Sequence, residues 1–197
     1  MDVIDHIRST FAESIEVKRE AAEYLPTAIG TSADLIVQTF LQGGKLLICG
    51  NGGSAADAQH AAAEFVNRFE LERPGLPALA ITTDTSTLTS IANDYRFADV
   101  FGRQIRALGQ PGDCLMAITT SGTSENIIEA VAAAHERDLR VILLSGRDGG
   151  DTGAMLNPSD IEVRVHTQST ARIQEVHLLV IHCLCDLVDQ QLFGADS

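Results

Sequence analysis

Five short apolar runs mark the chain, and each ends abruptly in Gly, Ser, Thr, Asp or at a polar segment. They span 45–50, 78–84, 114–122, 140–146 and 161–165. Within each run Val, Ile, Leu and Ala follow one another almost without a break, rather than alternating with polar residues. Strands of this composition are covered on both faces, so the pattern predicts a parallel sheet.

Helical patterns lie between these runs, at 54–69, around 97–108 and at 124–138. The alternation of strand and helix with short links predicts an α/β fold, a doubly wound five-stranded parallel sheet flanked by helices. Ligands of such domains bind beyond the carboxyl ends of the strands. We therefore expect the functional residues in the loops that follow the strands.

Both ends of the chain also predict helices. The segment 1–42 is helix-forming with two apolar stripes, and 171–193 forms one long apolar helix. These helices carry more apolar surface than one sheet face can cover, so we expect them to take part in oligomerisation. No repeat or linker interrupts the sequence, which predicts a single domain over 1–197, with its α/β core and C-terminal helix over 43–197. The first stripe consists of Val3, Ile4, Ile7, Phe11 and Ile15.

The composition fits a globular domain, because 45% of the 197 residues are hydrophobic and 21% are charged; a disordered chain is excluded. The 14 Lys and Arg against 27 Asp and Glu give a net charge of -13, so we expect no direct contact with nucleic acid. No apolar run reaches the ~20 residues of a membrane span, and the start lacks a signal-peptide pattern. These features predict a cytoplasmic protein without a membrane partner.

The segment after the third strand concentrates hydroxyl groups around Gly122. Ser124 is placed to cap the following helix, whose free N–H groups and dipole favour an anion. This is a phosphate cradle that needs no Lys or Arg, although an ordinary capped turn has a similar composition. We favour phosphate because five of the six residues 119–124 bear hydroxyl groups, among them Thr119, Thr120, Ser121 and Ser124.

A second polar loop, 50–54, follows the first strand and also leads into a helix. It reads Gly-Asn-Gly-Gly-Ser, which is not the GxGxxG pattern of a dinucleotide site. Alone it could be a tight turn. Together with the hydroxyl loop on the same sheet edge, it predicts a shared pocket for a small polar ligand.

Two helices could supply metal ligands. His60 and Glu64 are four residues apart and share one helix face. Gln174 and His182 lie on the final helix, about 80° apart around its axis. Two imidazoles, a carboxylate and an amide can bind a divalent metal, with zinc favoured by His and Glu. From spacing alone, a surface i,i+4 pair and a satisfied core histidine are the favoured explanation of these residues.

Two further pairs of residues stay ambiguous at this stage. Asn93 and Asp94 follow the second strand in a predicted loop, where such residues commonly cap helices. Glu175 and His177 lie near Gln174 with no role that the spacing defines.

Four motifs taken in order, CGNGGSAADAQH, SIANDYRF, ITTSGTSENI and RIQEVHLLVIH, resemble the sugar isomerase (SIS) family and, within it, the phosphoheptose isomerases. The resemblance covers nearly the whole chain. It implies a homotetramer that interconverts sedoheptulose 7-phosphate and D-glycero-D-manno-heptose 7-phosphate, the first step toward ADP-heptose and the lipopolysaccharide core.

The resemblance also implies roles for individual residues. The phosphate would be held by Thr119, Thr120, Ser121 and Ser124, and the rest of the sugar phosphate by Asn51, Gly52, Gly53, Ser54, Glu64, Asn93, Asp94 and Gln174. One zinc ion per subunit would be bound by His60, Glu64, Gln174 and His182. Glu64 would be the base and His182 the acid.

This assignment suits the reaction. An aldose and a ketose differ by one proton on carbon and one on oxygen, exchanged through an enediol. A carboxylate can carry the carbon-bound proton, an imidazole can serve the oxygens, and a metal would stabilise the enediolate charge. A carboxylate that binds zinc is a weaker base, so Glu64 is ligand, base or both in turn.

A non-catalytic relative, the DnaA initiator-associating protein, provides the alternative. The segments FAESI, AAEYLP, RALG and CLCDLVDQQLF resemble that tetrameric protein, and Ala171 stands where many of the isomerases carry an acidic residue. That relative lacks the carboxylate at Glu64 and the hydroxyl at Ser121, whereas this chain has both. We therefore favour the isomerase, with a replication initiator as the partner under the alternative.

Overall fold

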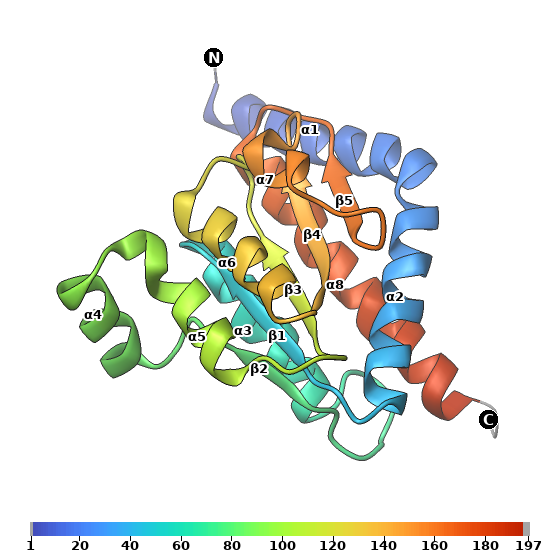
Figure 1. Ribbon diagram of the computed structural model, residues 1–197. Helices are drawn as coiled ribbons and strands as arrows, with labels where there is room; N and C mark the ends of the chain where they lie inside the picture. The colour runs from blue at the N-terminus through green and yellow to red at the C-terminus, as the bar shows by residue number, and fades with distance from the viewer. Residues whose placement is uncertain (1, 195–197) are drawn as a thin grey trace.

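Five parallel strands form the centre of the structure, a computed structural model that describes residues 2–194 (Figure 1). The strand order is β2-β1-β3-β4-β5, and every neighbouring pair is parallel. The predicted α/β sheet is therefore confirmed. The strands are β1 Leu46–Gly50, β2 Ala78–Ala80, β3 Cys114–Ile118, β4 Arg140–Gly146 and β5 Ile161–Val165.

Helices cover both faces of this sheet. One face packs against α1, α2, α3 and α8, and the other against α4, α5 and α6. Side chains of β1 alternate between the two cores: Ile48 belongs to the first, and Leu47 and Cys49 to the second. The helices are α1 Val3–Tyr24, α2 Pro26–Leu41, α3 Gly53–Val66, α4 Thr85–Asp94, the 3-10 helix η1 Phe97–Asp99, α5 Val100–Leu108, α6 Glu125–Glu136, α7 Gly150–Ala154 and α8 Thr170–Phe193.

The region after β2 differs from the prediction. The apolar run 78–84 forms a strand only as far as Ala80, because Asp84 already caps the next helix. Its carboxylate accepts the backbone N–H of Thr87 at 3.1 Å and the hydroxyl of Thr87 at 2.6 Å. The prediction that Asn93 and Asp94 lie in a loop was wrong, since they are the last two residues of α4.

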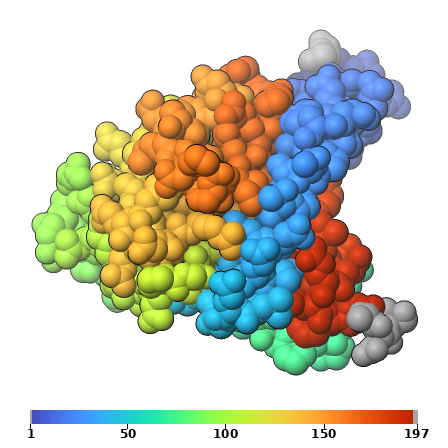
Figure 2. All heavy atoms as spheres, turned by 45° about the vertical axis from the view of Figure 1, so that its right-hand side comes forward, coloured from blue at the N-terminus to red at the C-terminus, as the bar shows by residue number. Residues whose placement is uncertain are grey.

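Helix α1 lies along one side of the molecule. Its N-terminal part, in dark blue, projects from the rest of the molecule at the top of Figure 2. Ser14 donates to the carboxylate of Glu175 on α8 at 2.6 Å, and the Arg172 guanidinium donates to the Thr10 carbonyl at 2.8 Å. The predicted apolar stripe faces away from these contacts; Phe11, for example, is 67% exposed. Its burial in an oligomer stays a prediction.

Helix α8 begins one residue before the predicted apolar segment 171–193 and ends where that segment ends. Among the described residues it alone is long and apolar enough to cross a membrane by length and composition. Its buried side chains, such as Ile173, Val180 and Leu184, belong to the core on one sheet face. A core helix passes the same test, and α8 has that position here.

Candidate active site

Helices α3 and α8 bring two distant imidazoles together. His60 Nε2 lies 2.9 Å from His182 Nε2, although 122 residues separate them in the chain. The rings meet edge to face with centroids 5.1 Å apart. On the other side of the His60 ring, Glu64 Oε1 lies 3.6 Å from Nδ1. Glu64 and His182 therefore contact the same imidazole.

Phe69, which sequence analysis did not select, completes this cluster. Its ring stacks on His182 with centroids 5.5 Å apart. It lies just beyond the end of α3, in a segment whose only sequence signal is a lone aromatic residue. The stacking fixes the plane of the imidazole and leaves its edge directed at His60.

The chemical types of the donor atoms suit a metal ion, but their positions suit it less well. Within residues 2–194, no group of three or more His, Cys, Asp or Glu side chains is arranged to hold a metal ion. Two nitrogens bound to one tetrahedral zinc lie about 3.3 Å apart, slightly farther than the 2.9 Å between the two Nε2 atoms. A zinc ion would need the rings to separate by a few tenths of an ångström and the Glu64 carboxylate to turn toward them.

Gln174, the remaining predicted metal ligand, lies against the first residue of α3. Its amide packs so tightly on Gly53 that a Cβ there would lie 2.6 Å from Nε2, so a side chain at position 53 would displace the Gln174 amide. Ser54, the second residue of α3, is buried. Gln174 thus lies next to the polar segment 50–54 that follows β1.

The hydroxyl loop after β3 is held by a tight approach of the backbone. Gly122 has φ +70°, and a Cβ there would lie 2.0 Å from the Gly149 carbonyl oxygen. The Gly122 carbonyl accepts both the N–H and the hydroxyl of Thr152, at 2.9 and 2.8 Å. Glycine is therefore required for conformation and for space, and α7 anchors the loop.

The hydroxyl groups of this loop differ in availability. Thr119 is buried and accepts the N–H of Gly122 at 3.2 Å. Ser124 is the N-cap residue of α6, as predicted, but its side chain makes no capping hydrogen bond. An ordinary capped turn would use that hydroxyl, so its freedom favours a ligand at the start of α6.

An amide pair joins the two loops. Asn51 Nδ2 donates to Asn126 Oδ1, and Asn126 Nδ2 donates to Asn51 Oδ1, each at 2.8 Å. Both side chains line a pocket of about 350 Å³, together with Ser124, Arg96 and Phe97. Sequence analysis missed Asn126, whose one signal is a polar residue in the first turn of a helix.

Asn93 and Asp94 stand apart from this arrangement. Both are exposed, and Asn93 Nδ2 donates to Asp94 Oδ1 at 2.9 Å. Helix α4, which ends with them, lies at the periphery of the molecule (Figure 1). Within the described chain, the structure gives neither side chain a hydrogen bond to the two loops or to the imidazole pair.

Three titratable groups near the site have shifted pKa values. Burial raises the pKa of Asp57, one turn before His60, against a smaller opposite effect of that imidazole. Burial lowers the pKa of His177 to about 4, although its Nε2 donates to the Ser145 carbonyl at 2.9 Å. Burial acts to raise the pKa of Glu175, but the hydrogen bond from Ser14 and nearby cations outweigh it and lower the value. Hydrogen bonds within the fold therefore hold His177 and Glu175, and we assign both residues a structural role.

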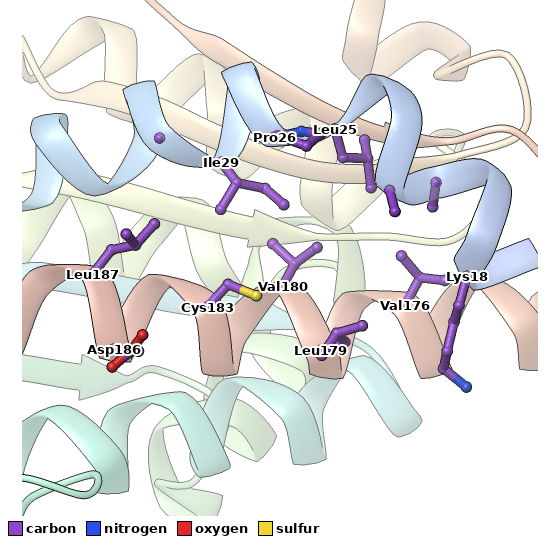
Figure 3. A pocket seen from close by; sticks show the side chains of 13 residues that line it. Lys18, Leu25, Pro26, Ile29, Val176, Leu179, Val180, Cys183, Asp186 and Leu187 are labelled. Carbon is purple, nitrogen blue, oxygen red and sulfur yellow. The ribbon is translucent and has the colours of Figure 1, made fainter.

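A larger cavity, of about 520 Å³, lies between α1, α2 and α8 (Figure 3). Its walls are mostly aliphatic, with Leu25, Ile29, Val180 and Leu187 among them. Such a surface suits apolar side chains rather than a sugar phosphate. The polar strip from His182 through Gly53 and Asn51 to Ser124 is the candidate active site.

A doubly wound sheet with this strip at its strand ends defines a domain that binds small polar ligands. Residues 10–146 match the SIS domain family. The chain belongs to that family.

Comparison with individual relatives shows which group of the family the chain resembles. It is 59% identical over 195 residues to the phosphoheptose isomerase of Chromohalobacter salexigens, covering 99% of each chain. It is 59% identical over 197 residues to that of Aromatoleum aromaticum, covering 100% of each. Phosphoheptose isomerase GmhA from Neisseria gonorrhoeae superimposes with a TM-score of 0.92 at 51% identity, covering 96% of this chain and 100% of that chain. Within the SIS family the chain groups with the phosphoheptose isomerases, as its motifs predicted, and it is an isomerase.

Proposed function

We propose that this isomerase converts sedoheptulose 7-phosphate to D-glycero-D-manno-heptose 7-phosphate through an enediol, the first step toward ADP-heptose and the lipopolysaccharide core. The observation that carries the proposal is the contact of both Glu64 and His182 with the His60 imidazole, beside two polar loops. The names of the relatives at 59% identity support the substrate.

The two polar loops bind different parts of the substrate. The phosphate binds at the N-terminus of α6, where the hydroxyls of Thr119, Thr120, Ser121 and Ser124 and the helix dipole stabilise an anion. The sugar hydroxyls are held by the amides, hydroxyl and backbone of Asn51, Gly52, Gly53, Ser54 and Gln174. Asn93 and Asp94 are proposed as further hydroxyl contacts, and their exposed side chains are open to a ligand.

The proton transfers use two groups on different helices. The Glu64 carboxylate removes the proton from one carbon of the C1–C2 pair and returns it to the other. The His182 imidazole donates to one oxygen and accepts from the other, and the His60 ring keeps both groups in reach of one small molecule. His60, Glu64, Gln174 and His182 would hold a zinc ion, which when bound stabilises negative charge on the enediolate oxygens.

The proposed assembly is a homotetramer of single-domain chains, each spanning 1–197. The exposed stripe of α1 and the apolar cavity between α1, α2 and α8 support it, because both leave aliphatic side chains open to water. We also propose a cytoplasmic location, where the phosphorylated sugar would be made. The alternative, a non-catalytic initiator-associating protein, is resembled in four short segments, but the relatives reported above are named phosphoheptose isomerases.

Incubation of the purified protein with sedoheptulose 7-phosphate tests the proposal, with aldose formation as the readout. We expect turnover by the wild type and a loss of at least about 100-fold for Glu64→Gln, because that change removes the base. Glu72→Gln, whose carboxylate is 90% exposed eight residues further along, is the matched control and should retain the wild-type rate.

Each result has a distinct meaning. No aldose from the wild-type protein would refute the substrate and the reaction. Full turnover by Glu64→Gln would remove Glu64 from the role of base. Elemental analysis of protein purified without chelator checks the zinc, and a fully active metal-free enzyme would remove zinc from the proposal.

A further inference from the structure

The reciprocal amide pair between Asn51 and Asn126 connects the two halves of the candidate site. Asn51 follows the last residue of β1, and its carbonyl accepts the N–H of Ser54 at 3.0 Å. Asn126 is the second residue of α6, directly after the phosphate-binding segment. The pair therefore fixes how far the sugar-binding loop lies from the start of α6.

Burial and reciprocity make this contact specific. Asn126 is 3% exposed, so losing its partner would leave an amide largely without water. An amide offers both a donor and an acceptor, and the two 2.8 Å bonds use one of each from both side chains. Asp, Ser or Leu at position 126 would break at least one of the bonds.

We propose that Asn126 is a positioning residue, which acts through Asn51 to set the spacing between the loop that binds the sugar hydroxyls and the loop that binds the phosphate. This inference rests on the proposed function. It predicts that Asn126 matters for a ligand that spans both loops and has little effect on a ligand that fills only the phosphate loop.

The test compares those two ligands in Asn126→Ala. We expect KM for sedoheptulose 7-phosphate to rise about 10-fold, the effect of about 1.4 kcal/mol, with kcat reduced less than KM is raised. The inhibition constant of inorganic phosphate should stay within about twofold of the wild-type value. Asn157→Ala, at an exposed loop position, is the control and should change neither constant.

A double-mutant cycle shows whether Asn126 acts through its partner. If it does, Asn126→Ala should have little further effect on KM in an Asn51→Ala chain. Thermal denaturation checks that each variant is folded, and Asn126→Ser replaces any Asn126→Ala chain that is not. Purely additive effects of the two substitutions would overturn the inference.

Three more results would overturn it. These are an unchanged KM for the folded variant, equal weakening of inorganic phosphate, or a fall in kcat alone. Calorimetric titration with sedoheptulose 7-phosphate separates this inference from the proposed reaction. Binding without turnover by the wild type refutes the reaction only, and the same variants then report on Asn126 through their dissociation constants.

Discussion

His177 should make the stability of this protein depend on pH above the range where carboxylates titrate. The side chain is fully buried between α8 and β4, and burial lowers its pKa from 6.5 to about 4. Between those values the unfolded chain binds a proton that the folded chain does not bind, so the free energy of unfolding falls as the pH falls. Each pH unit in this window removes about 1.4 kcal/mol.

Lowering the pH from 7 to 5 should therefore cost about 2 kcal/mol, or about 4–8 °C in Tm for a chain of this length. Circular dichroism melting at one fixed protein concentration measures it, because oligomerisation makes Tm depend on concentration. His177→Gln keeps a donor for the Ser145 carbonyl and cannot titrate, so its Tm should vary less with pH. Equal pH dependence in the two proteins would refute the burial argument.

The remaining predictions concern the hydroxyl loop and the outer helix. Gly122→Ala should raise KM for the sugar phosphate more than 10-fold, because its φ of +70° and the Gly149 carbonyl 2.0 Å from the new Cβ displace the loop; steady-state kinetics decide, and an unchanged KM would contradict the packing. The double substitution Ser121→Ala and Ser124→Ala should also raise KM, with kcat less affected, and an unaltered KM would move the phosphate elsewhere. Phe11→Glu should yield a smaller species in size-exclusion chromatography with light scattering, and retention of the wild-type mass would exclude this stripe from the interface.

The centre of the sheet could be predicted from sequence because β1, β3 and β4 are buried on both faces. Unbroken apolar runs such as Leu46–Gly50 and Cys114–Ile118 leave little choice of structure. Helix α4 could not, since Thr85, Ser86 and Thr87 have low helix propensity. The local cap from Asp84 starts that helix, and the burial of Ile91, which depends on tertiary packing, holds it in place.

The candidate site was predictable as two halves. Spacing placed His60 and Glu64 on one face, and the structure puts them 3.6 Å apart. Their meeting with His182 depends on how α3 packs on α8, which no local pattern encodes. Asn126 was missed for a similar reason, because a single polar residue in a helix looks like surface until its buried partner is known.

The separation of 122 residues between the paired imidazoles has a consequence for biosynthesis. A growing chain completes all five strands and both polar loops before α8 has been translated. The same helix supplies His182 and closes one sheet face, so a ribosome-bound intermediate has neither a sealed interior nor the proposed proton-transfer pair. Premature termination before α8 thus yields an inert product that exposes its core to chaperones and proteases.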